Sequence, residues 1–155
     1  MTRLAVFVAT VAYCGYFPFA PGTVGSAAGL VVYLLVWWSG SPVVEIGLIV
    51  GLFAAGVWAG TITERYFGGV DPGPIVLDEV VGMLITLAFI PSLGWSGALA
   101  GFVLFRIFDV IKPYPAGRFE QLHGGLGVMA DDAMAAIYAN LALRLLLWLT
   151  PGWIA

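Results

Sequence analysis

The sequence predicts an all-α fold, a polytopic membrane helix bundle of five or six short helices. Three observations support this prediction. Of the 155 residues, 61% are hydrophobic and 10% are charged, whereas a soluble domain carries about 25% charged residues. Apolar runs follow one another along the chain, with glycine and proline between them. Glycine and alanine are frequent inside the runs, and such small residues let membrane helices approach closely.

Five apolar runs supply the longer helices. Most are close to the lower limit of about 17 residues for a helix that spans a bilayer. They cover residues 24–38, 43–63, 75–90, 98–111 and 133–149. No internal repeat or linker divides the chain, so residues 1–155 are expected to form a single integral-membrane domain.

A shorter apolar run, residues 4–17, precedes these five and is too short to span a bilayer. It follows one basic residue, Arg3, as a signal peptide would, but it leads to no A-x-A-like cleavage site. We therefore expect a retained short helix, which is re-entrant or lies at the membrane interface.

The basic residues predict how the bundle is oriented. If each longer run crosses the membrane once, the three long loops that begin near residues 17, 66 and 112 share one face. That face and the helix leading to it carry Arg65, Arg106, Lys112 and Arg118, whereas the two opposite loops contain no Lys or Arg. Because basic loops stay on the cytoplasmic side of a membrane, the three long loops are expected to face the cytoplasm.

The charge and the cysteine content exclude several classes of protein. The net charge of −3 gives no basic patch for binding nucleic acid. The single cysteine, Cys14, excludes an intrachain disulfide and a multi-cysteine metal site. Glu45, Glu64 and Arg65 lie near predicted helix ends, where we expect them to be solvated.

Five carboxylates are expected to gather at the cytoplasmic end of the bundle. All of them lie near run ends that face the long loops: Asp78, Glu79, Asp109, Asp131 and Asp132. An ionisable group within the membrane costs about 3 kcal/mol or more, and five like charges repel one another unless a cation neutralises them. Oxygen ligands of this kind suit Mg²⁺ or a similar hard cation.

Structural roles compete with this interpretation. An aspartate of the pair 131–132 can cap the last helix. Arg106 and Asp109, three residues apart on one helix face, can form a structural ion pair. Asp78 and Glu79 favour a functional site most, because neither lies at an obvious cap and no Lys or Arg is near them in sequence.

Carboxylates, a cation and nearby basic side chains together suit phosphate chemistry, in which a metal-activated water attacks a phosphate held by cations. The loop FAPGTVGS leads into a helix whose N-terminus can receive an anion, and it offers the hydroxyls of Thr23 and Ser26. Covalent phosphatase mechanisms lack their residues. Cys14 has no arginine at the required spacing, no D-x-D-x-[TV] motif occurs, and His123 is the single histidine.

Four blocks of the sequence are recognisable as a set. In chain order they are GYFPFAPGTVGS, LDEVVGM, FRIFDVIKPYPAGRFE and GGLGVMADDAMAAIYA, which extend from residue 15 to residue 139. The set resembles the phosphatidylglycerophosphatase A family of bacteria. The resemblance implies a Mg²⁺-dependent, multi-pass enzyme of the cytoplasmic (inner) membrane with its active site facing the cytoplasm. Such an enzyme removes the terminal phosphate of phosphatidylglycerophosphate and so makes phosphatidylglycerol.

The resemblance also implies roles for single residues. Asp78 and Glu79 would be metal ligands, or one of them the base for water. Asp131 and Asp132 would complete the metal site, and Asp109 would ligate or orient. The expected catalytic residues are Glu79, Asp78 and Asp132. The residues expected to bind the substrate phosphate are Thr23, Ser26, Arg106, Lys112 and Arg118.

Two alternatives remain open from the residues alone. Intramembrane acids also bind coupling cations in transporters and channels, although here they gather at one face and no inverted repeat is visible. A phosphatase of the same kind can instead act on another phosphorylated lipid or on an isoprenoid-like headgroup.

Overall fold

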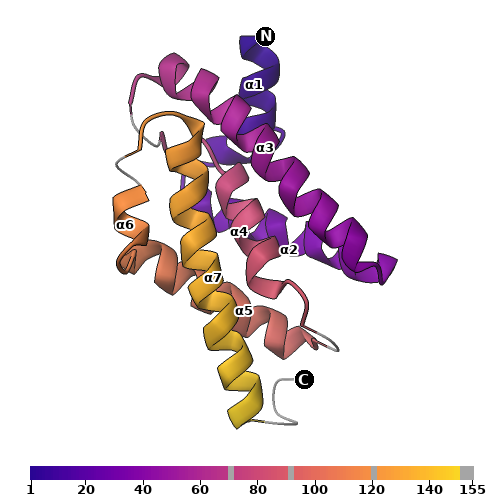
Figure 1. Ribbon diagram of the computed structural model, residues 1–155. Helices are drawn as coiled ribbons and strands as arrows, with labels where there is room; N and C mark the ends of the chain where they lie inside the picture. Colours follow the sequence, from indigo (N-terminus) through magenta and orange to yellow (C-terminus); the bar gives the residue numbers. More distant parts are fainter. Residues whose placement is uncertain (70–71, 91–92, 120–121, 151–155) are drawn as a thin grey trace.

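The computed structural model is all α-helical in the residues that it describes, which are 1–69, 72–90, 93–119 and 122–150. The described residues form seven α-helices and one short 3₁₀ helix, and Figure 1 shows how the α-helices are arranged. Their bounds are α1 Thr2–Ala9, η1 Cys14–Tyr16, α2 Pro21–Ser39, α3 Pro42–Phe67, α4 Leu77–Leu87, α5 Trp95–Ile111, α6 Ala116–Phe119 and α7 Gly125–Leu149. The all-α prediction is confirmed. The five apolar runs correspond to α2, α3, α4, α5 and α7, while the one-turn helix α6 has no apolar run and was not predicted.

Three of the described helices, α2, α3 and α7, are long and apolar enough to cross a membrane. In the most apolar window of α3, 17% of the residues are buried inside the bundle, so most of its apolar surface faces outward. Apolar surface of that extent has no place in water, whereas lipid covers it without cost. The chain is therefore a membrane protein.

The two remaining runs form helices that are shorter than the sequence suggested. The helix α4 has 11 residues and is therefore about 16 Å long, roughly half the thickness of a hydrocarbon core. With 17 residues, α5 is at the lower limit of spanning length. The expectation that each of the five runs crosses the membrane once as a helix therefore fails for α4, because residues 75–76 and 88–90 of its run lie outside the helix.

The short helix α4 occupies the middle of the bundle, with α7 in front of it and α2 behind it in Figure 1. Nine of its 11 residues are buried. Its apolar side chains form the main core together with residues of α5 and α7; Leu84, Phe105 and Leu143 are representative members. A helix that is covered on all sides can carry a site that is shielded from lipid and from bulk water.

Glycines of α2 let this helix pack closely along α4. A Cβ atom on Gly25 would lie 2.7 Å from the Cβ of Val76, and one on Gly29 would lie 2.7 Å from the Cβ of Met83. No side chain fits in such spaces, so the two helices approach at the glycines. The contacts advance in the same direction along both helices, which places the starts of α2 and α4 side by side.

The end of α5 and the start of α7 lie at this same end of the bundle. Lys112, which ends α5, has its Nζ 2.7 Å from Oδ2 of Asp131 near the start of α7. We call this end, which contains the starts of α2, α4 and α7, the carboxylate end. The alternation of the runs predicted that these three helix starts would share a face.

The N-terminal helix α1 also packs at the carboxylate end. Its residues Ala5 and Ala9 pack with Ala59 of α3, and the carbonyl of Ala9 accepts a hydrogen bond of 3.0 Å from the amide of Val76. This helix has eight residues and cannot span a bilayer, in agreement with the expected short helix. It ends at Ala9, earlier than the apolar run to residue 17, because the chain turns there into the left-handed conformations of residues 11–13.

Candidate metal and phosphate site

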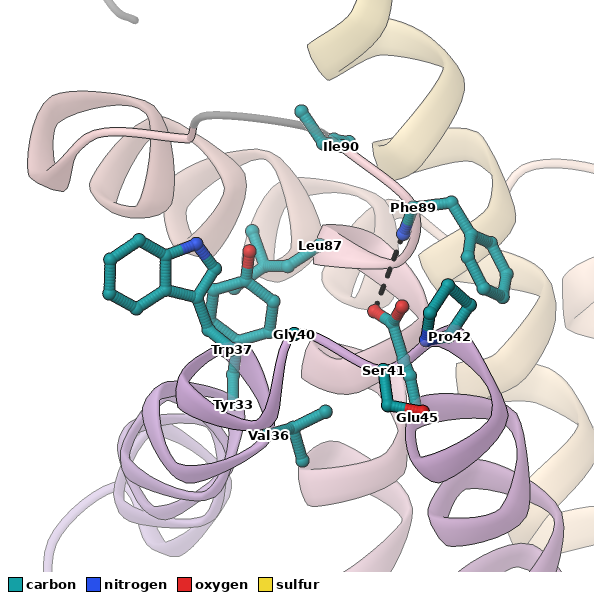
Figure 2. A pocket seen from close by; sticks show the side chains of 10 residues that line it. All are labelled: Tyr33, Val36, Trp37, Gly40, Ser41, Pro42, Glu45, Leu87, Phe89 and Ile90. Atoms are coloured by element: carbon teal, nitrogen blue, oxygen red, sulfur yellow. Dashed lines mark hydrogen bonds between the residues drawn. The ribbon is translucent and has the colours of Figure 1, made fainter.

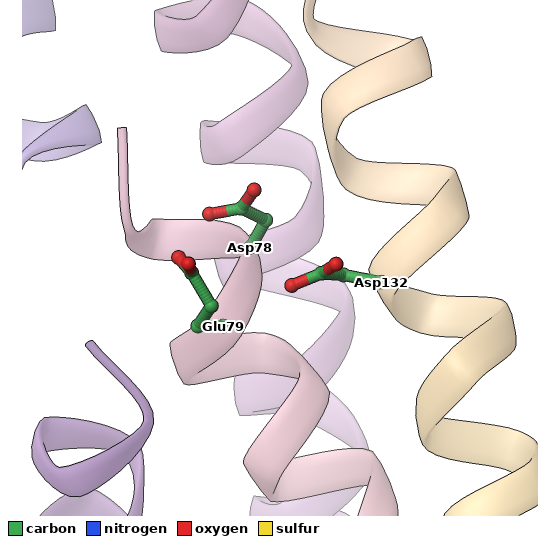
Figure 3. Close-up of side chains that lie close together, drawn as sticks. All are labelled: Asp78, Glu79 and Asp132. Carbon is green, nitrogen blue, oxygen red and sulfur yellow. The ribbon is translucent and has the colours of Figure 1, made fainter. Parts of the chain in front are cut away.

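Three carboxylates converge where α4 begins against α7 (Figure 3). Asp78 and Glu79 project from the first turn of α4, and Asp132 projects toward them from α7. One carboxylate oxygen of each residue lies within 4.8 Å of the corresponding oxygens of the other two. Oxygens bound to one hard cation at 2.0–2.6 Å lie at most about 5 Å apart. The spacing of the three side chains therefore fits a shared metal ion.

Two further aspartates border this trio. Asp132 lies close enough to Asp109 for a side-chain hydrogen bond, and it also lies near Asp78 and Asp131. Glu79 in turn lies near Asp109 and Asp132. We call these five residues the carboxylate cluster. The structure thus brings together the five carboxylates that the sequence singled out, from three different helices.

Two basic residues contact the carboxylate cluster. Nη1 of Arg106 lies 2.7 Å from Oδ2 of Asp109 and 3.9 Å from Oε1 of Glu79. On the other side, Lys112 forms the 2.7 Å ion pair with Asp131. These ion pairs set two cations against five carboxylates. If all five are ionised, three negative charges are in excess, and a divalent cation would neutralise two of them.

Buried oxygens of the cluster also favour a cation. Among the described residues, Oε2 of Glu79 and Oδ2 of Asp132 are buried and have no hydrogen-bond partner. A buried carboxylate oxygen without a partner is costly unless a positive charge or a donor meets it. Because all the side-chain donors of the cluster are oxygens, they suit Mg²⁺, Mn²⁺ or Ca²⁺ better than a softer metal. The residues present therefore fit a bound divalent metal ion.

The first turn of α2 closes one side of the site. Gly22 approaches so closely that a Cβ atom there would collide with Oε1 of Glu79 and would lie 3.1 Å from Nη1 of Arg106. The buried hydroxyl of Ser26, one turn later, donates to the carbonyl of Gly22 at 2.9 Å and accepts from Arg106 at 3.5 Å. Ser26, which the sequence predicted to bind phosphate, thus contacts the site through its hydrogen bond with Arg106. Sequence reasoning missed Gly22, although it begins the glycine series 22, 25 and 29.

Two predicted phosphate-binding residues lie outside these contacts. Thr23 is exposed on the first turn of α2. Arg118 is exposed on α6, where its guanidinium carbon lies 5.0 Å from the ring centre of Tyr114 and its Nη1 donates to the Tyr114 hydroxyl at 3.4 Å. Within the described residues, neither side chain forms a hydrogen bond or an ion pair with the carboxylate cluster. Their role in binding phosphate stays a prediction.

The helix that carries Asp131 and Asp132 is capped by α3. Oε2 of Glu64 accepts a 2.7 Å hydrogen bond from the amide of Gly124, and Oγ1 of Thr61 accepts a 3.0 Å bond from the amide of Gly125. These bonds satisfy amides that a helix N-terminus leaves without partners. Sequence reasoning missed both residues, because about 60 positions separate them from the amides that they meet.

This arrangement corrects two expectations. The proposal that an aspartate of the pair 131–132 caps the last helix is wrong, because α7 begins at Gly125 and Asp131 is its seventh residue. The expectation that Glu64 is solvated is also wrong, since it is partly buried and bonded to Gly124. The alternative of an ion pair between Arg106 and Asp109 is correct, and it coexists with the cluster.

Comparisons with known proteins identify the family of this chain. A family model described as phosphatidylglycerophosphatase A matches residues 7–147. A Haemophilus influenzae protein named phosphatidylglycerophosphatase A is 43% identical over 121 residues, which are 77% of this chain and 74% of that protein. An Escherichia coli (strain K12) protein with the same name is 39% identical over 128 residues, which are 79% of this chain and 72% of that protein.

A further relative carries a different name. The Bacteroides thetaiotaomicron protein named "Putative phosphatidylinositol-3-phosphatase" is 35% identical over 152 residues, which are 94% of each chain. No solved structure matches the chain significantly. Because the family model covers most of the sequence and two relatives share its description, the chain belongs to the phosphatidylglycerophosphatase A family.

Proposed function

We propose that this protein is a membrane phosphatase that hydrolyses the terminal phosphomonoester of phosphatidylglycerophosphate to phosphatidylglycerol and phosphate, as a single domain. The observation that carries the proposal is the group of three carboxylates, the buried Asp78 and Asp132 and the partly buried Glu79, at one end of a bundle whose outer surface is apolar. Membership of the family supports the substrate. A lipid substrate also explains why a hydrolase should lie in a membrane.

Mg²⁺ is the proposed cofactor, and Asp78, Glu79 and Asp132 would hold it, with Asp109 and Asp131 beside them. The oxygens of Glu79 and Asp132 that have no hydrogen-bond partner among the described residues support this assignment. When bound, the ion would act as a Lewis acid that neutralises negative charge on the phosphate and activates the attacking water.

The chain's own residues then orient the phosphate and accept a proton. Arg106 lies between Asp109 and Glu79, so its planar guanidinium can donate to a phosphate bound at the cluster. Lys112 can do so from the other side, with Ser26 fixing Arg106. Asp78 or Glu79 would accept the proton of the attacking water. Thr23 and Arg118 are proposed to contact the headgroup from the exposed side.

The active site is proposed to face the cytoplasm, in the inner membrane of a bacterium. Basic residues are concentrated at the carboxylate end, on α1, α3, α5 and α6 and at the C-cap of α5; they are Arg3, Arg65, Arg106, Lys112 and Arg118. Exposed tryptophans lie near the opposite ends of α2, α5 and α7; they are Trp37, Trp38, Trp95 and Trp148. Basic residues favour the cytoplasmic side, and tryptophans favour the membrane–water interface.

A second substrate has support from one relative. The name of the Bacteroides protein indicates the 3-phosphate of an inositol lipid, which is also a phosphomonoester on a lipid headgroup. The carboxylate cluster can serve either substrate, because the reacting group is the same. Family membership favours a phosphatase over a cation-coupled transporter.

A substrate panel tests the proposal. Purified protein in detergent micelles would receive phosphatidylglycerophosphate, phosphatidylinositol 3-phosphate or phosphatidic acid, each with Mg²⁺ and with EDTA, and released phosphate would be measured. We expect the highest kcat/KM for phosphatidylglycerophosphate and no release in EDTA. A higher value for the inositol lipid would replace the proposed substrate. Cation flux in proteoliposomes without phosphate release from any lipid would contradict phosphatase function.

A further inference from the structure

The helix α4 ends inside the bundle. It begins with Asp78 and Glu79 in its first turn and ends at Leu87, about 16 Å farther on. The last carbonyls of any helix have no amide partner within that helix. In an apolar membrane bundle no water is available to replace them, so other groups must donate to the end of α4.

A single side chain of α7 meets three of these carbonyls. The amide nitrogen Nδ2 of Asn140 donates to the carbonyls of Ile85 at 3.2 Å, Thr86 at 2.9 Å and Ala88 at 3.1 Å. Asn140 therefore links α7 to the last turn of α4, and its side-chain amide caps the C-terminal end of α4.

Two charged side chains, those of Arg144 and Glu45, form hydrogen bonds with the backbone just beyond the end of α4. Nη2 of Arg144 donates to the carbonyls of Ala88 at 2.9 Å and Phe89 at 3.0 Å, and its Nε donates to Oδ1 of Asn140 at 2.8 Å. From the start of α3, Oε1 of Glu45 accepts a 3.3 Å bond from the amide of Phe89, as Figure 2 shows. Phe89 has a φ of +55°, which a large side chain seldom adopts unless its surroundings hold it.

The two ends of α4 contact α7 in the same register. At the carboxylate end Asp78 lies beside Asp132, and eight residues farther along each helix Thr86 lies beside Asn140. Eight residues correspond to about 12 Å of helix. The bonds of Asn140 thus set how far α4 is advanced along α7, and that advance sets the separation of Asp78 and Asp132.

Metal binding is sensitive to this register. A slip of one residue would move the carboxylates of α4 by about 1.5 Å along the axis and turn them by about 100°. Ligand distances at a metal site hold to about ±0.2 Å. A much smaller displacement of α4 would therefore weaken metal binding while the bundle stays folded.

We propose that Asn140, with support from Arg144, is a positioning residue for the carboxylate cluster, although it contacts the opposite end of α4. It acts through the backbone of α4 and touches neither metal nor substrate. The metal part of this inference rests on the proposed function, whereas the register between α4 and α7 does not. A side chain that only stabilised the fold would lower the unfolding temperature without changing the metal affinity of the folded protein.

The decisive variant is Asn140→Asp, which keeps the size of the side chain but presents an acceptor oxygen to three carbonyls. The probe is Mn²⁺ alone, and its binding to the purified full chain in micelles would be measured by electron paramagnetic resonance. We expect affinity about 10-fold weaker, the lower end of the effect of losing a supporting partner of a ligand. Excess Mn²⁺ should restore phosphate release. The control is Leu141→Ala, an exposed neighbour on α7, which should bind Mn²⁺ normally.

A second measurement reads the register without any metal. In a Cys14→Ser background, the paired substitutions Asp78→Cys and Asp132→Cys should form a disulfide readily on oxidation, and adding Asn140→Asp should slow that reaction. If Asn140→Asp binds Mn²⁺ like the unmodified protein and also cross-links at the same rate, Asn140 has no positioning role.

Two other results separate the inferences. If the unmodified protein binds no Mn²⁺, the proposed metal chemistry is wrong, and the cross-linking rate alone decides about Asn140. If Asn140→Asp does not fold, Arg144→Ala decides, because it removes the bonds to Ala88, Phe89 and Oδ1 of Asn140 but leaves those that Asn140 donates to α4. A folded Arg144→Ala protein with weaker Mn²⁺ binding and slower cross-linking supports the inference, and unchanged values contradict it.

Discussion

Nζ of Lys112 lies 2.7 Å from Oδ2 of Asp131 and thereby joins the end of α5 to α7 at the border of the carboxylate cluster. Asp131 is 2% exposed, whereas the Lys112 side chain is 21% exposed. Lys112 also ends α5 with a φ of +45°, a left-handed conformation that costs a lysine free energy. The backbone there is held in a strained form that brings the ammonium group to a buried carboxylate.

We expect Lys112→Met to lose both stability and activity. Removing one partner of a largely buried ion pair costs about 3–5 kcal/mol, and partial exposure of the lysine favours the lower value. Unfolding temperature in detergent and release of phosphate would be measured. Arg65→Gln, which removes an exposed charge on the last turn of α3, is the control and should leave both unchanged. Equal behaviour of the two variants would show that the Lys112 ion pair contributes nothing.

Loss of single carboxylates should separate chemistry from folding. We expect Glu79→Gln and Asp132→Asn to fold normally and to release phosphate at least about 100-fold more slowly, because each loses a metal or proton-transfer role. Both changes keep the shape of the side chain and remove a buried charge, so the unfolding temperature measured in EDTA should not fall below that of the unmodified protein in EDTA. The measurements are kcat in micelles and thermal unfolding. Near-normal turnover in either variant would remove that residue from the site.

The sequence predicted which carboxylates form the cluster, but not the residues of α2 and α3 that pack against the site or cap α7. Asp78 and Glu79 stood out because a charge is rare inside an apolar run, and the alternation of runs brought Asp109, Asp131 and Asp132 to the same end. Those inferences need only local patterns. The close approach of Gly22 and the caps from α3 depend on pairs of residues that are far apart in the chain, and no local pattern specifies such pairs.

Helix length was the least accurate prediction for a related reason. The run of residues 75–90 has the composition of a spanning helix, yet α4 ends at Leu87. The early end is possible because Asn140 and Arg144 of α7 donate to its last carbonyls. Hydropathy measures what a segment prefers to face, but it contains no information about which distant donor closes a helix.

Removing the metal should affect stability as well as activity. A ligand that binds the folded state stabilises it by about 2.7 kcal/mol at 100 times its dissociation constant. We therefore expect EDTA to abolish phosphate release and to lower the unfolding temperature, and Mg²⁺ or Mn²⁺ to restore both. In the Asp132→Asn variant, the same addition should raise the unfolding temperature much less. Full activity in EDTA would contradict the metal model.

A final prediction concerns the contact between Gly22 and Glu79, since a Cβ atom at Gly22 would collide with Oε1 of that carboxylate. Gly22→Ala should displace Glu79 or Arg106, and misplacement of about 1 Å at a reacting centre can lower the rate up to about 100-fold. The matched control is Gly47→Ala in α3, where an added Cβ atom meets nothing within 4 Å. Alanine there should raise helix stability by up to about 1 kcal/mol. Rates and unfolding temperatures of the two variants would be compared in the same micelles. Normal turnover by Gly22→Ala would mean that α2 can retreat from Glu79 freely, and that the first turn of α2 does not help to position the site.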